Sequence, residues 1–80
     1  MAQEGLNARD KRAKFLELAN KRVSRTLKDI GLVANLANRR NYDYTEEEAR
    51  KIVKTLQARV DQVKRDFESG LQTSKNKFEL

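Results

Sequence analysis

The sequence predicts an all-α protein, folded as an antiparallel two-helix hairpin. Two series of apolar residues recur at steps of three and four positions, which is the spacing of one helix face. Helix breakers are scarce, because the chain has no proline and only three glycines. Both tyrosines and three asparagines fall between the two series, in residues 35–44. Two long helices joined by so few residues are expected to be antiparallel neighbours.

The first helix is expected at about residues 8–38, a length of about 45 Å at 1.5 Å per residue. Asn7, with Asp10 three residues later, is expected to cap its start. Its apolar stripe is read from the spacing of Leu16, Ala19, Val23, Leu27, Ile30, Ala34 and Ala37. A turn at 39–44 follows, in which Asn38 and Asn41 would supply the left-handed conformations of a helix exit.

The second helix is expected at about residues 46–69. Thr45 and Glu48 have the spacing of a capping box, and Tyr44 and Ala49 that of a hydrophobic staple. Ser69-Gly70-Leu71 is typical of a glycine C-cap. A coiled-coil-like seam is formed by Ala49, Val53, Leu56, Val60, Val63 and Phe67, with Ile52 alongside. The hairpin domain is thus expected over residues 1–71, with a flexible C-terminal tail at 72–80.

Acidic residues precede basic ones by four positions in both helices, a spacing that stabilises a helix by a few tenths of a kcal/mol per pair. We expect five such pairs, namely Asp10–Lys14, Glu17–Lys21, Glu46–Arg50, Glu47–Lys51 and Asp61–Arg65.

The composition predicts that this hairpin assembles into a homo-oligomeric helical bundle. Only 38% of the 80 residues are hydrophobic and another 38% are charged, so a single chain has little core to offset its entropy. Disulfides are impossible without cysteine. A dimer would be a four-helix bundle. The expected oligomer interface comprises Leu18, Ile30, Leu32, Val33 and Leu36, because residues 30–37 are apolar on most sides. The alternative is that Leu32 and Leu36 dock a foreign protein.

The net charge of +6 favours an anionic partner, and the excess lies in the first helix. Residues 9–28 contain eight basic and two acidic side chains, whereas residues 46–68 contain six of each. We define the basic face as Lys11, Lys14, Lys21, Arg22, Arg25 and Lys28, which fall opposite the apolar stripe. Such a row can contact successive phosphates of DNA or RNA. The alternatives are an ordinary solvated face or an anionic lipid surface.

The segment between the helices offers a second candidate site. Arg39 and Arg40 could bind phosphate, and Tyr42 and Tyr44 could stack on bases. A structural interpretation competes with this one. The arginines would complement the carbonyl end of the first helix, and Tyr44 would be the staple residue.

Several classes of function are disfavoured by residues that are missing. Without histidine or cysteine, and without a glycine-rich phosphate loop, the sequence predicts no enzyme. It also predicts no cofactor and no metal site, since three consecutive glutamates at 46–48 do not converge on one helix. No apolar run has membrane-spanning length, and the N-terminus has no signal-peptide pattern. We therefore expect a cytoplasmic protein with no membrane partner.

Residues 18–56 resemble small uncharacterised bacterial and phage-type helical proteins. The resemblance rests on an Asn-Leu-x-Asn-Arg-x-Asn-Tyr-x-Tyr-Thr core, here Asn35 to Thr45. It covers about half the chain and supplies no site residues. It implies a small accessory protein, of the kind that mobile elements encode.

Two functions follow from these expectations. The first is a homo-oligomeric protein that binds nucleic-acid phosphates through the basic face, aided by Arg39, Arg40 and Tyr42. The second is a protein-interaction module, such as a phage-encoded inhibitor or adaptor, whose basic face meets an acidic protein surface.

Overall fold

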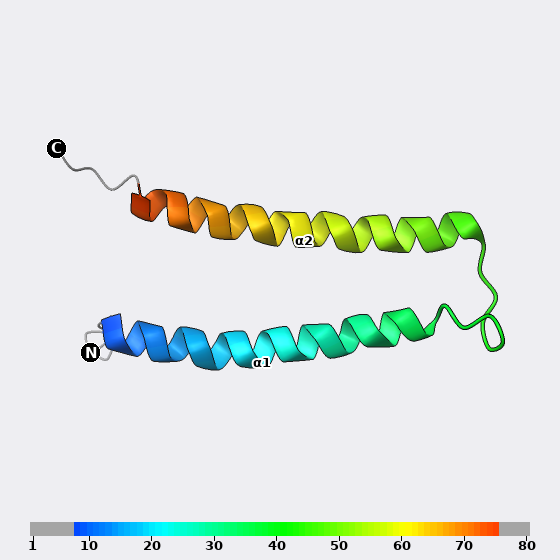
Figure 1. The fold of residues 1–80 in the computed structure, drawn as a ribbon, viewed down its shortest axis with the longest axis horizontal. Helices are drawn as coiled ribbons and strands as arrows, with labels where there is room; N and C mark the ends of the chain where they lie inside the picture. Colours follow the sequence, from blue (N-terminus) through cyan, green and yellow to red (C-terminus); the bar gives the residue numbers. More distant parts are fainter. Residues whose placement is uncertain (1–7, 76–80) are drawn as a thin grey trace, which may run out of the picture. The chain divides into compact units, whose positions relative to one another are not determined.

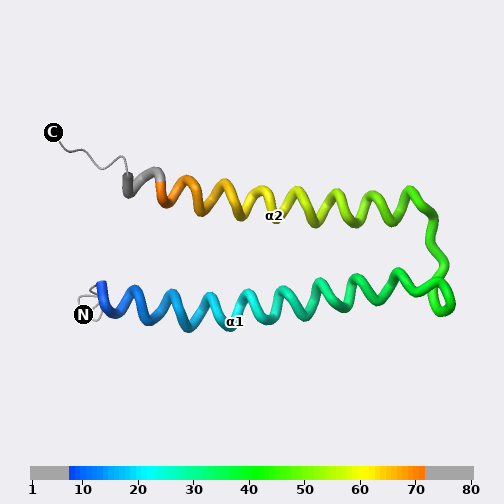
Figure 2. Tube along the Cα trace, viewed as in Figure 1, coloured from blue at the N-terminus to red at the C-terminus, as the bar shows by residue number. Residues whose placement is uncertain are grey.

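The computed structural model describes residues 8–75, with side chains through residue 71, and contains two helices in succession (Figure 1). Helix α1 spans Ala8–Asn35, 28 residues, and α2 spans Glu46–Lys75, 30 residues. The described residues form no strand, so the predicted all-α class is confirmed. The chain divides into two units between Tyr42 and Asp43, and each unit contains one helix. Figure 2 follows the unbroken trace of each helix and the connector, residues 36–45.

Helix α1 ends at Asn35, three residues before the predicted end. The backbone N–H groups of Leu36, Ala37 and Asn38 each donate to the carbonyl three residues earlier, at 3.0 to 3.2 Å. Such tighter bonds satisfy the last carbonyls of a helix. The Asn38 side-chain oxygen then accepts the Arg40 N–H at 2.9 Å, as in an Asx turn.

The predicted left-handed exit at Asn38 and Asn41 is wrong. No described residue other than glycine has a positive φ. The carbonyl of Asn38 accepts the N–H groups of Asn41 at 3.1 Å and Tyr42 at 3.0 Å. The connector therefore turns the chain through ordinary turn conformations, in which the Asn38 side chain and carbonyl replace a left-handed residue.

Helix α2 begins where the capping box predicted. The Glu48 N–H donates to Thr45 Oγ1 at 3.0 Å, and the Thr45 N–H donates to Glu48 Oε1 at 2.9 Å. The first helical bond runs from the Ala49 N–H to the Thr45 carbonyl at 3.1 Å. Tyr44 and Ala49, the predicted staple pair, are both half-buried. The start of α2 is thus set by reciprocal bonds within four residues.

The predicted glycine cap at Gly70 is wrong, because α2 continues to Lys75. Neither described glycine has a positive φ, so Gly70 is an ordinary helical residue. A single glycine costs a helix interior about 1 kcal/mol relative to alanine, which a long helix tolerates. Residues 72–75, predicted as tail, are therefore helical. The rest of the predicted tail, and the Asn7 cap, lie outside the described residues.

Side-chain pairs along α2 only partly follow the prediction. Arg50 Nη2 contacts Glu46 Oε2 at 2.7 Å, as expected. Asp61, the predicted partner of Arg65, accepts a hydrogen bond from Gln57 at 3.1 Å. Arg65 donates to Gln62 Oε1 at 2.9 Å. Long polar side chains on one helix face thus have several partners within reach.

No described residue of this chain is buried. Five are half-buried, namely Leu18, Ala19, Val33, Tyr44 and Ala49, and every other described side chain is exposed. Fifteen large apolar side chains are among the exposed ones, including the whole seam of α2 beyond Ala49. Within each unit, the described residues therefore form no buried interior of the kind that stabilises a folded domain.

Candidate nucleic-acid interface

All six residues of the basic face lie within α1, and all six side chains are exposed. At 100° per residue they occupy a sector of about 120°, and they extend along about 25 Å of helix. The sector lies opposite the apolar stripe, whose members Leu16, Val23 and Leu27 are also exposed. Regular helix from Ala8 to Asn35 thus places the six cations in one row.

Leu18 and Leu32 fall within the same sector as the basic face. Leu18 is half-buried, whereas the side chain of Leu32 is 57% exposed. Leu18 thus lies within the row of cations and Leu32 just beyond its C-terminal end. A simple solvated face does not require apolar side chains at these positions.

Thr26 lies on the flank of the apolar stripe of α1. Its Oγ1 donates to the Arg22 carbonyl at 2.8 Å. The hydroxyl hydrogen is thereby used within the helix, and the methyl group is the apolar part of this side chain. The Arg22 side chain takes no part in this bond.

The connector places Arg39, Arg40 and Tyr42 in the same unit as the basic face. All three are exposed, and the Tyr42 side chain is 47% exposed. Because α1 ends at Asn35, its last turn contains no basic residue. The helix-dipole interaction decays within that turn. The dipole therefore explains Arg39 and Arg40 less well than the sequence suggested.

The residues of the predicted oligomer interface face more than one side of α1, as the apolar pattern of residues 30–37 led us to expect. Leu18 and Val33 are half-buried, Ile30 is 39% exposed, and Leu36 lies just beyond the helix end with 44% exposed. At 100° per residue, Ile30 points about 120° or more away from both Leu18 and Leu32. A single partner helix cannot cover all five residues.

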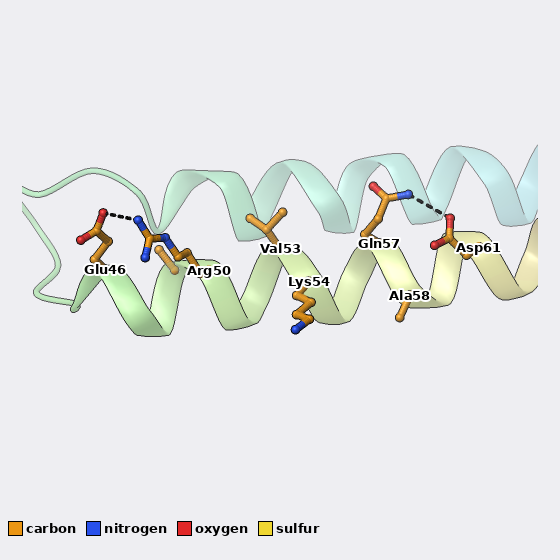
Figure 3. Close-up of a pocket in the computed structure, with 8 residues that line it drawn as sticks. Glu46, Arg50, Val53, Lys54, Gln57, Ala58 and Asp61 are labelled. Atoms are coloured by element: carbon orange, nitrogen blue, oxygen red, sulfur yellow. Dashed lines mark hydrogen bonds and ion pairs between the residues drawn. The ribbon is translucent and has the colours of Figure 1, made fainter.

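Two shallow hollows lie on α2, and neither was predicted from the sequence. The first is shown in Figure 3, where the Glu46–Arg50 ion pair and the Gln57–Asp61 hydrogen bond lie beside Val53. The second contains three basic residues, and its lining is Lys54, Thr55, Ala58, Arg59, Gln62 and Arg65. The sequence signal that could have predicted the second hollow is Ala58, a small residue that stands at helical spacing between long basic side chains.

Other chemistry receives no support from the described residues. No group of three or more acidic side chains among them is placed to hold a metal ion. No described helix is both long and apolar enough to cross a membrane.

No family model, curated protein or solved structure matches this chain significantly. The resemblance to small phage-type proteins at Asn35–Thr45 therefore stays a prediction, and the function has to be inferred from the residues themselves.

Proposed function

We propose that this protein is a non-enzymatic, self-associating helical protein that binds nucleic-acid phosphates through the basic face of α1. The observation that carries the proposal is that all six cations of the basic face are exposed on one side of α1. Arg40 and Tyr42, exposed in the connector of the same unit, extend the surface beyond the helix end. Cytoplasmic localisation is part of the proposal.

The spacing of the cations suits a polyanion better than a single anion. Most successive members stand three to seven residues apart, which is about 4 to 10 Å along the helix. The phosphates of a nucleic-acid strand are spaced on this scale. The interaction would be sequence-tolerant, because α1 presents lysine and arginine without asparagine or glutamine in the same row to read base edges.

A second candidate, binding to an acidic protein surface, is favoured by Leu32. This leucine is 57% exposed beside the basic face, and Leu36 beyond it is 44% exposed. A protein partner would bury both leucines, whereas nucleic acid would contact mainly the cations.

The test replaces three cations of the basic face by glutamate, in the variant Lys14→Glu, Lys21→Glu and Arg25→Glu. Binding to duplex DNA and to single-stranded RNA is measured by fluorescence anisotropy between about 50 and 200 mM salt. We expect wild-type affinity to fall steeply with salt. The variant should lose at least about tenfold in affinity, and its salt slope should fall by about 2 to 3 because three phosphate contacts are lost.

The matched control is the variant Lys51→Glu, Lys54→Glu and Arg65→Glu on α2. It makes the same change in net charge with the same residue types. Circular dichroism must show equal helicity for both variants. Equal loss of binding in both would contradict a specific role for α1, and so would wild-type protein that fails to bind at about 50 mM salt. In the latter case the Leu32→Asp variant tests the protein-partner alternative by pull-down.

A further inference from the structure

The apolar face of α2 is exposed along most of its length within the described residues. We call it the α2 seam, comprising Ala49, Val53, Leu56, Val60, Val63, Phe67 and Gly70. Val53 is 64% exposed, Val60 52% and Phe67 58%. The 4-3 spacing is that of a coiled-coil core, with Val53, Val60 and Phe67 at a positions and the others at d. Water-exposed seams of this kind are stabilised by a second helix.

The charges flanking the seam disfavour a parallel pair of α2 helices. In a parallel coiled coil, each g position faces the e position five residues later on the other helix. Arg59 occupies a g position and Lys64 the following e position. A parallel homodimer would therefore place Arg59 beside Lys64 of the second copy twice, and like charges at this position oppose association.

In an antiparallel pair of α2 helices, charged residues beside the seam attract each other across the interface. When Val60 lies opposite Val63 of the second copy, Leu56 lies opposite Phe67 and Val53 opposite Gly70. Antiparallel helices bring g positions beside g positions, so Arg59 meets Asp66 of the second copy. The two-fold axis repeats this pair. If the helices slide by one heptad, Val53 lies opposite Val63 of the second copy. Arg59 then lies beside Arg59 of the second copy, and the like charges repel.

The hydrogen bonds within α2 are compatible with this arrangement. Asp66 Oδ1 accepts a bond from Gln62 Nε2 at 3.0 Å, which leaves lone pairs on the second carboxylate oxygen. Gln57 Nε2 donates to Asp61 Oδ1 at 3.1 Å, which leaves its carbonyl oxygen as an acceptor for Lys64 of the second copy. Arg59 and Asp66 are seven residues apart, about 10 Å along the helix, and cannot pair within one chain.

We propose that a second copy of this chain covers the α2 seam as an antiparallel coiled coil, in the register that pairs Arg59 with Asp66 of the other copy. The proposal rests on the self-association in the proposed function and does not depend on phosphate binding. It differs from the interface predicted on α1, because it needs none of the residues Leu18, Ile30, Leu32, Val33 and Leu36.

The first test exploits the absence of cysteine in the sequence. Full-length Leu56→Cys and Phe67→Cys variants are oxidised separately and as an equimolar mixture, and covalent dimer is counted on a non-reducing gel. The mixture should form dimer in which each chain contributes one variant, identified by mass, and either variant alone should form little. Efficient crosslinking of each variant alone would indicate a parallel pair and overturn the proposal. A monomeric mass with no crosslink in any sample would mean that no second copy covers the seam, and would equally overturn the proposal.

The second test is a charge swap that leaves the core unchanged. Arg59→Glu and Asp66→Arg, each alone, should weaken dimerisation by about tenfold, because each turns two attractive pairs into repulsive ones. The double variant restores opposite charges across the axis and should return the dissociation constant to within about twofold of wild type. Analytical ultracentrifugation without nucleic acid measures all four proteins, so the outcome is separate from that of the binding assay. Additive weakening in the double variant would overturn the register.

Discussion

Thr45 shows how much of this structure depends on single side chains. Its hydroxyl and the carboxylate of Glu48 exchange two bonds with each other's backbone N–H groups, at 3.0 and 2.9 Å. Both donors would otherwise have no partner within the helix. Asn38 plays the corresponding part at the other end of the connector, where it accepts the Arg40 N–H. Side-chain oxygens therefore accept backbone N–H groups near both ends of the connector.

Removal of the Thr45 hydroxyl should shorten α2 at its start. We expect Thr45→Ala to lower the free energy of unfolding by about 1 kcal/mol, because the Glu48 N–H loses its acceptor. Thr45→Ser should keep near-wild-type stability. Thr55→Ala, in the middle of the same helix, is the control and should be neutral or slightly stabilising. Thermal unfolding followed by circular dichroism measures all three. Equal behaviour of Thr45→Ala and Thr55→Ala would contradict the capping role.

Each helix has one apolar face, and their remaining surfaces differ. Helix α1 carries the excess of positive charge, whereas α2 begins with Glu46, Glu47 and Glu48 in its first turn, where negative charge suits the helix dipole. Both helices also contain an interior glycine, Gly31 in α1 and Gly70 in α2. A Cβ atom at either position would meet nothing within 4 Å. These glycines weaken their helices without a visible local reason.

Gly31 provides a test of whether α1 is closely approached by another chain. In the chain alone, a Cβ at this position meets nothing within 4 Å. Gly31→Ala should therefore raise the helicity of α1 and stabilise the protein by about 1 kcal/mol. Chemical denaturation with urea measures the change. A loss of stability would show that a partner helix packs closely against Gly31.

The protein as a whole has no interior of its own among the described residues. The large apolar side chains that are exposed have exposed fractions of 37 to 65%, far more than a core tolerates. Burial of these side chains needs a further helix, which under the proposed self-association comes from a second copy. Folding and association should then be coupled.

Coupled folding and association predicts that thermal stability depends on protein concentration. A tenfold increase in concentration should stabilise a dimer by about 1.4 kcal/mol and raise the melting temperature by several degrees. Circular dichroism melts at a series of concentrations test this directly. A midpoint that stays constant from low micromolar to high micromolar protein would mean that a single chain buries its own apolar faces.

How far the sequence predicts this structure differs between helix starts and helix ends. Thr45 and Glu48 identified the start of α2 because both partners of each bond lie within four residues. The ends were missed at both helices, since Asn35 precedes the expected end and Gly70 does not stop α2. A helix ends where the next residues find better partners, as Leu36 and Asn38 do, and that competition is not visible in periodicity.

The candidate site, too, was predictable from the sequence only in part. Membership of the basic face was predictable, because regular helix from Ala8 to Asn35 converts spacing into a common side. Whether Arg39 and Arg40 complement the helix dipole was not predictable, because it depends on the residue at which α1 ends. The amino-acid pattern thus dictates two amphipathic helices and the side on which each charge lies, because these follow from a period of 3.6 residues. Only the folded structure reveals that no described side chain is buried, because burial depends on which surfaces meet and not on the order of residues along one helix.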